Sequence, residues 1–166
     1  MPEDASSSPR DRKLSTDDFL SPARIEQAAL RLISRAEQCS FALTAKLRRR
    51  GFDADLVKTL ISELIEQDLL NDSRYAELWV RSRLSAGKTQ SPRSMIISLS
   101  NKGIDRISAQ KALKTALNLE AEYDLLIKYL EKKCFNHNYA GYKLKSLLKN
   151  EGFSGEVINR YFEGFQ

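Results

Sequence analysis

The stretch Leu47-Arg48-Arg49-Arg50-Gly51-Phe52-Asp53 decides the fold, because its pattern occurs three times in the chain. It returns as LSNKGID at residues 99–105 and as LKNEGFS at residues 148–154, so the glycines stand 52 and 49 positions apart. Self-similarity at a nearly constant period is typical of repeat proteins. An apolar residue also stands eight positions before each glycine, namely Leu43, Met95 and Leu144.

Each copy of this pattern predicts a break between two helices. Glycine accepts the left-handed conformation that ends a helix. The apolar residue after it can pack back over the finished turn, and the Asp or Ser that comes next can cap the free amides of a new helix. The residues in these two positions are Phe52, Ile104 and Phe153, followed by Asp53, Asp105 and Ser154.

Further signals place nine helices. Ser21-Pro22 and Ser91-Pro92 each put a capping residue before a proline at the first helical position, and Ser40 opens the helix that ends at Gly51. Apolar residues at helical spacing between Leu56 and Ile65 form a stripe that we expect in the core. The predicted helices cover residues 22–36, 40–50, 53–68, 72–86, 92–102, 105–117, 120–134, 139–151 and 155–164.

The sequence therefore predicts an all-α chain of three tandem three-helix repeats. We expect a disordered tail at residues 1–20 and repeats at 21–70, 71–118 and 119–166. A unit this small is marginally stable alone, so neighbouring units should stack into an elongated solenoid, either straight or curved. No self-complementary face is evident, which predicts a monomer.

Composition excludes several classes of protein. Seven Gly and four Pro in 166 residues argue against turn-rich β architecture. Cys39 and Cys134 are isolated, so we expect buried small side chains in a reducing cytoplasm rather than a disulfide or a zinc site. We find no apolar run that fits a signal peptide or a membrane span.

Catalytic groups are nearly absent from the sequence. His137 is the sole histidine and falls in a polar linker, and no Walker loop, GxGxxG, HExxH or calcium loop occurs. The sequence therefore predicts a protein that is not an enzyme and needs no cofactor or metal.

Positive charge is concentrated in the middle of the chain. The net charge is −2 for residues 1–20, +1 for 21–70, +6 for 71–118 and 0 for 119–166. An unbalanced basic face is a common footprint of proteins that bind polyanions. Within the middle third, Arg74, Arg81, Arg83, Lys88 and Arg93 are the candidate binding residues, whereas Tyr75 and Trp79 are expected in the core.

A second basic cluster, Arg48, Arg49 and Arg50, ends a predicted helix, and two interpretations stay open. The cations can simply interact with the negative end of the helix dipole. Alternatively, they form a patch that contacts phosphates, for which the arginine fork is well suited.

The ordered set of these motifs resembles the RecX family. The motifs are Leu43 to Leu47 with Gly51-Phe52, the phrase Leu69-Leu70-Asn71-Asp72-Ser73-Arg74-Tyr75-Ala76, and Val80-Arg81-Ser82-Arg83. They continue as Gly87-Lys88, Ser91-Pro92-Arg93 and Leu99 through Ile104. The likeness covers about residues 22–164, although the family often has Gly-Pro where this chain has Ser91-Pro92.

The resemblance implies a regulator of the RecA recombinase. Such a protein lodges in the groove of the RecA filament on DNA, limits filament growth or promotes disassembly, and so moderates recombination, DNA repair and the SOS response. It would contact single- or double-stranded DNA weakly and without sequence preference.

Two other functions are compatible with the pattern. Three helices with a glycine turn also describe helix-turn-helix transcription factors, but two of the three candidate recognition helices begin with Asp53 or Asp105, which would face phosphates. A purely structural scaffold is the other alternative, and the charge of residues 71–118 argues against it.

Overall fold

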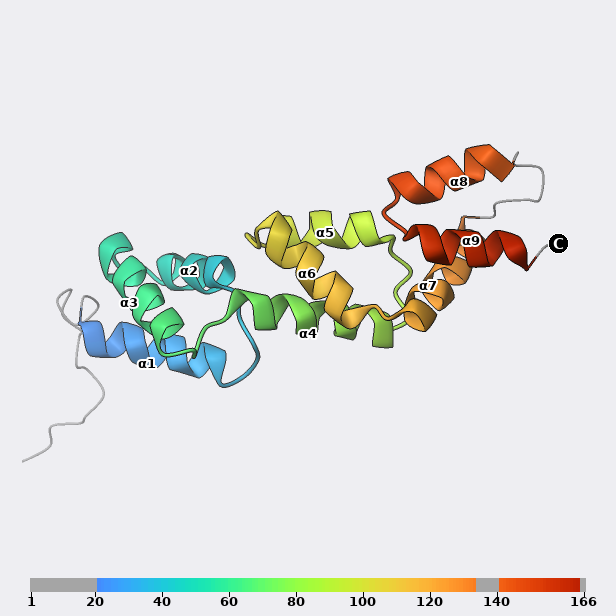
Figure 1. Cartoon of the computed structure of the whole chain (residues 1–166). Helices are drawn as coiled ribbons and strands as arrows, with labels where there is room; N and C mark the ends of the chain where they lie inside the picture. Colours follow the sequence, from blue (N-terminus) through green and yellow to red (C-terminus); the bar gives the residue numbers. More distant parts are fainter. Residues whose placement is uncertain (1–20, 134–140, 165–166) are drawn as a thin grey trace, which may run out of the picture.

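The computed structural model describes residues 21–133 and 141–164, and Figure 1 shows an elongated arrangement of helices. The expected tail at residues 1–20, Cys134 and His137 lie outside the described residues. Within the described part, the chain contains nine α-helices and no strand, which confirms the all-α prediction. The helices are α1 (Pro22–Ile33), α2 (Ser40–Arg49), α3 (Ala54–Glu66), α4 (Asp72–Ser85), α5 (Pro92–Ser100), α6 (Arg106–Ala116), α7 (Leu119–Lys132), α8 (Gly141–Asn150) and α9 (Gly155–Glu163).

The three glycines of the repeated pattern adopt the predicted left-handed backbone. Their φ angles are +88° at Gly51, +83° at Gly103 and +88° at Gly152. The apolar residue after the glycine is buried in the second and third copies, at Ile104 and Phe153. The glycine turn therefore reverses the chain and returns an apolar side chain to the core.

The helix caps follow the prediction in the repeated pattern and also at Ser91, whose hydroxyl accepts from the Ser94 amide at 3.3 Å. The Asp53 carboxylate accepts hydrogen bonds from the amides of Asp55 and Leu56 at 2.9 and 3.2 Å, and Asp105 accepts one from Ser108 at 2.9 Å. Ser154 likewise caps α9 through the Val157 amide.

One predicted cap was wrong in detail, because Ser21 precedes α1 without a side-chain capping bond. Ser40 opens α2 as predicted, and Cys39 occupies the cap position before it. Ser40 also bonds Asp72 of α4 through its amide at 2.7 Å and its hydroxyl at 2.6 Å, so this serine joins two helices of different groups.

The buried apolar residues form two clusters. One cluster lies within α1, α2 and α3 and includes Leu43, Leu47 and Leu64. The other runs through α4 to α9 without interruption, and Cys39 at the start of α2 belongs to it. Helices nevertheless pack mainly in threes, α1 to α3, α4 to α6 and α7 to α9. The repeat boundaries themselves stay a prediction.

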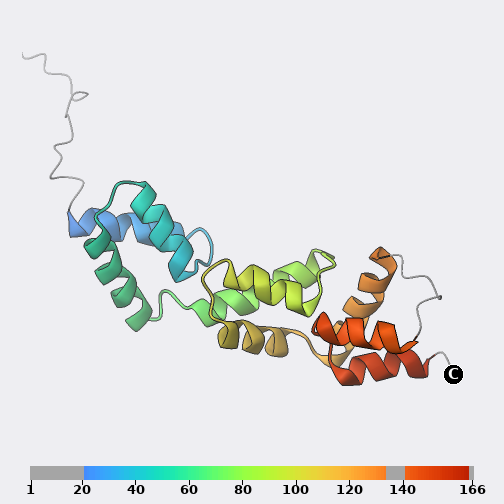
Figure 2. The ribbon, with the colours of Figure 1, turned by 90° about the horizontal axis from the view of Figure 1, so that it is seen from above.

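The helices α2, α5 and α8 follow one another along the molecule, as Figures 1 and 2 both show. The start of α2 lies against the end of α5, and the start of α5 lies against the end of α8. The Cys39 thiol donates to the Lys102 carbonyl at 3.3 Å, and the equivalent Ser91 hydroxyl donates to the Glu151 carboxylate. We call this arrangement of α2, α5 and α8 the helix row.

Glycine is required at both joints of the helix row. A Cβ atom on Gly103 would lie 2.5 Å from the Cβ of Phe41 in α2. A Cβ atom on Gly152 would lie 3.1 Å from the backbone nitrogen of Arg93 in α5. Among residues 21–133 and 141–164, no atom lies within 4 Å of the corresponding position on Gly51, and we call this the open end of α2.

Candidate functional site

The arginine triplet at the end of α2 is the most open group of predicted binding residues. Helix α2 ends at Arg49, and Arg50 follows as its C-terminal cap immediately before Gly51. Arg48, Arg49 and Arg50 are all exposed, and no ion pair joins them to a described carboxylate. The helix dipole favours cations here, but it leaves the guanidinium groups free to bind an anion.

Arg74 in α4 is the most constrained of the predicted residues. Its Nε lies 2.7 Å from a Glu37 carboxylate oxygen, and its Nη1 lies 3.4 Å from the Asp68 carboxylate and 3.2 Å from the Asp68 carbonyl. These bonds tie the start of α4 to the segments before α2 and after α3. Arg74 therefore has a structural role, and any contact with a partner stays a prediction.

Arg81 and Arg83 differ although they are two residues apart. Arg81 is exposed on α4. Arg83 is half-buried, with its guanidinium carbon 4.8 Å from the centre of the Trp79 ring. Trp79 and Tyr75 pack against the larger core cluster, as predicted. The cation–π contact positions the Arg83 side chain along α4 but does not remove its charge.

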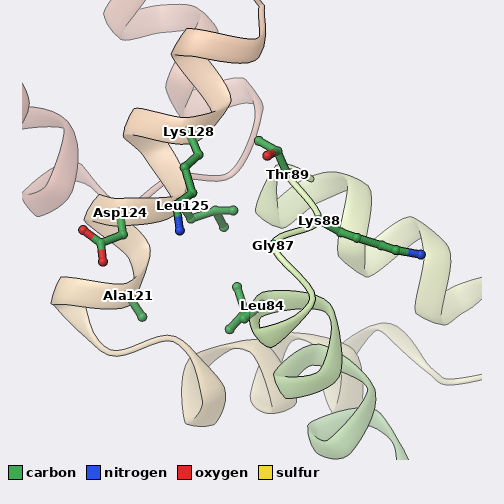
Figure 3. A pocket seen from close by; sticks show the side chains of 8 residues that line it. All are labelled: Leu84, Gly87, Lys88, Thr89, Ala121, Asp124, Leu125 and Lys128. Atoms are coloured by element: carbon green, nitrogen blue, oxygen red, sulfur yellow. The ribbon is translucent and has the colours of Figure 1, made fainter.

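Lys88 follows the turn at Gly87, where φ is +64°. A cavity of about 160 Å³ lies between this turn, the end of α4 and α7. Figure 3 shows that Leu84 and Leu125 project into the gap, whereas the Lys88 side chain leads away from Asp124 and Lys128. Lys88 is thus an exposed cation rather than part of an enclosed site.

Arg93 lies where α5 meets the end of α8. Its amide donates to the Glu151 carbonyl at 2.9 Å and its Nη1 donates to the Asn150 carbonyl at 3.2 Å. The side chain also lines a groove of about 680 Å³ between α5, α6 and the end of α8, together with Arg106 and Lys149.

The sequence interpretation missed Arg106 and Lys149. A signal for Lys149 was present, because it follows Leu148 in the repeated pattern as Arg48 follows Leu47. Arg106 carried no such signal, since only the packing of α6 against α5 brings it to the groove.

The predicted residues do not form one compact site. They lie on three parts of the molecule: the open end of α2, helix α4 with the following turn, and the groove beside α8 (Figures 1 and 2). Such a distribution suits a long partner, which can touch several parts of an elongated protein at once.

Carboxylates near the predicted sites have capping or pairing roles. The amides of Leu56 and Asp55 keep the pKa of Asp53 below its ordinary value, and bonds from Ser108 do the same for the pKa of Asp105. In the last three helices, Arg160 lies 2.7 Å from Glu120, which lowers the pKa of Glu120 and raises that of Arg160.

Within residues 21–133 and 141–164, no group of three His, Cys, Asp or Glu residues could hold a metal ion. None of the described helices combines the length and apolarity that crossing a bilayer requires.

Comparisons with known proteins agree with the fold. No family model matches the chain. The regulatory protein RecX of Pseudomonas entomophila is 29% identical over 86% of this chain and 92% of its own length. That of Treponema pallidum is 28% identical over 81% of each chain.

A solved structure gives the same result. The crystal structure of RecX from Lactobacillus salivarius is 27% identical and aligns with a TM-score of 0.65 over 86% of this chain and 95% of that one. The alignment with this structure agrees with the all-helical array. The chain is therefore similar in sequence and in fold to the RecX regulatory proteins.

Proposed function

We propose that this protein binds the filament of the RecA recombinase on DNA in the bacterial cytoplasm, and that it limits filament growth or promotes disassembly. Similarity to the RecX regulatory proteins supports a regulatory role. The elongated shape and the spread of exposed cations along it support a long, anionic partner (Figure 1).

The observation that carries the proposal is the open end of α2. Two of the three helices in the helix row end against the start of another helix, whereas α2 ends in Arg48, Arg49 and Arg50, and no described residue lies within 4 Å of a Cβ position on Gly51. A terminal surface of a repeat array needs polar residues, but three consecutive arginines exceed that need. Arginine can contact phosphate or carboxylate through two parallel hydrogen bonds.

The last three helices offer a contrast in charge. Arg160 is paired with Glu120, and the Lys145 ammonium lies 4.9 Å from the centre of the Phe162 ring. Residues 119–166 are also neutral overall. We therefore place the main contacts on α2 and α4, with a smaller contribution from α8.

RecA's DNA-dependent ATP hydrolysis, measured with and without this protein, tests the proposal. We expect the steady-state rate to fall as the protein is added, because fewer RecA subunits remain on DNA. Arg48→Glu with Arg49→Glu should weaken this effect strongly, and Lys143→Glu with Lys145→Glu is the control with the same charge change. An unchanged hydrolysis rate at high protein concentration would contradict the proposal.

Binding measurements then separate protein contacts from DNA contacts. Affinity is compared for the RecA filament, for RecA without DNA and for DNA alone. If the two double variants are folded and behave alike, the open end of α2 does not localise the contact.

A further inference from the structure

The groove between α5, α6 and the end of α8 has the features of a separate binding site. It has a volume of about 680 Å³ and lies where the second and third groups of helices meet. Pro92, Arg93 and Ile96 belong to α5, Arg106 and Gln110 to α6, and Lys149 to α8, so three helices form its walls.

The rim of the groove is cationic. Arg93, Arg106 and Lys149 are exposed there, and no described residue that lines the groove is acidic. None of the three cations forms an ion pair with a described carboxylate. Arg93 also donates to the Asn150 carbonyl, which holds its guanidinium beside Lys149. The rim therefore favours a ligand that carries negative charge.

The floor of the groove is apolar and aliphatic. Ile97 is 51% exposed, although it is a large apolar side chain, and it lies next to the half-buried Ile96 and the buried Leu113. None of the described lining residues is aromatic, so the groove has no surface on which nucleic-acid bases would stack. Phosphates alone would leave Ile97 uncovered.

We propose that this groove binds an acidic protein segment that carries an apolar side chain. Carboxylates of the segment meet Arg106 and Lys149, and the apolar side chain covers Ile97. Asn101 and Gln110 on the same walls can bond the backbone of the segment. The inference goes beyond the proposed function and is tested without RecA.

Fluorescence anisotropy with labelled peptides tests this inference on the full chain. One probe alternates Glu and Ala around a central Leu-Phe pair, a second has Ser-Ser in place of Leu-Phe, and a third is labelled oligothymidine. We expect the Leu-Phe peptide to bind the protein more tightly than the Ser-Ser peptide. Ile97→Ser should remove this preference, because the apolar side chain of the peptide then loses its contact.

A second part of the test reverses the charge of residues that line the groove. Arg106→Glu with Lys149→Glu should weaken binding of the Leu-Phe peptide about tenfold or more, as expected for losing two ion pairs and adding repulsion. Lys111→Glu with Lys114→Glu changes the charge equally on exposed residues of α6 outside the groove, and it should leave binding nearly unchanged. Circular dichroism establishes that both variants are folded.

Three results would overturn the inference. They are no binding of either peptide, equal affinity for the two peptides, and equal losses in the two double variants. If instead the Arg106 and Lys149 variant loses oligothymidine binding while peptides do not bind, the groove is a nucleic-acid site and the inference is wrong.

Discussion

The ends of α2 and α5 have the same backbone conformation and different surroundings. Both end before a glycine in the left-handed region, with φ of +88° at Gly51 and +83° at Gly103. The end of α5 is covered by Phe41 at the start of α2, whereas none of the residues that the structure describes lies within 4 Å of a Cβ position on Gly51. Gly51 is thus needed only because its backbone is left-handed. Gly103 is needed for the same backbone conformation and also because a Cβ atom there would overlap Phe41.

The same comparison explains where the arginines are. At the covered end, Lys102 is half-buried and its carbonyl accepts from the Cys39 thiol. The equivalent position at the open end is Arg50, which is exposed. Packing at the joint restricts which side chains fit there, and the absence of packing at the end of α2 permits three large cations.

The largest expected effect is on folding stability. Gly51→Ala should lower the free energy of unfolding by about 1–2 kcal/mol, the cost of a left-handed backbone for a residue with a Cβ. Gly103→Ala should lower it by about 1–3 kcal/mol more, because the new methyl group overlaps Phe41. Gly152→Ala should fall between them, and urea denaturation measures all three. Equal losses at Gly51 and Gly103 would show that the joint relaxes freely.

The second joint can be weakened through its hydroxyl group. Ser91 caps α5 through the Ser94 amide and donates to the Glu151 carboxylate of α8. Ser91→Ala should lower the free energy of unfolding by about 1–3 kcal/mol, because the cap is lost and the half-buried Glu151 carboxylate loses a partner. Ser62→Ala, on an exposed part of α3, is the control and should change stability little. A loss as small as that of the control would mean that the joint does not depend on this bond.

The open and covered ends should also differ in salt dependence of DNA binding. Arg50→Gln should reduce the slope of log affinity against log salt by about 0.7–0.9, the value for one lost phosphate contact. Lys102→Gln removes the same charge from the equivalent position at the covered end and should leave the slope nearly unchanged. Titrations at several salt concentrations measure both slopes. If Lys102→Gln has the larger effect, the contact lies at the joint and not at the open end.

The smallest expected effect concerns acid. Asp53 caps α3 beside the open end, and Asp105 caps α6 beside the covered end, and both have a pKa below the ordinary value. Because the folded pKa is lowered, each cap contributes stability that is present above the unfolded pKa of about 3.9 and is lost as pH falls through the folded value.

Asn is a good capping residue without this titration, so Asp53→Asn and Asp105→Asn should change stability little at neutral pH. Each should make the free energy of unfolding less sensitive to pH below about 4. Unfolding curves across this range measure the change. An unaltered acid profile in both variants would show that other carboxylates govern acid unfolding.

Local features of the fold could be predicted from the sequence because they depend on residues close together in the chain. The glycine turns and the caps at Asp53, Asp105 and Ser154 were predicted from single phrases. The predicted helices also match the observed ones to within about three residues at each end. Ser21 was interpreted by the same local rules but makes no side-chain capping bond. Ser40 begins α2 as predicted, but its bonds to Asp72 join distant segments and could not be predicted locally.

The candidate sites were less predictable because they depend on packing between distant segments. Nothing in the sequence around Arg74 indicates that Glu37 and Asp68 would hold its guanidinium. The groove needs Arg106 and Lys149 to come together from α6 and α8. A charge count locates a basic third of the chain, but it does not say which cations already have partners.

The helix row also sets a rule for adding length. Each joint pairs the start of the second helix of one group with the glycine end of the second helix in the next group. The middle group carries both halves of that contact, since its α5 starts at Pro92 and ends before Gly103. A copied middle group would therefore place the start of one α5 opposite the glycine end of the other, with Ser91 facing Lys102 where it now faces Glu151. A longer array built by copying this segment would depend on that one new pairing.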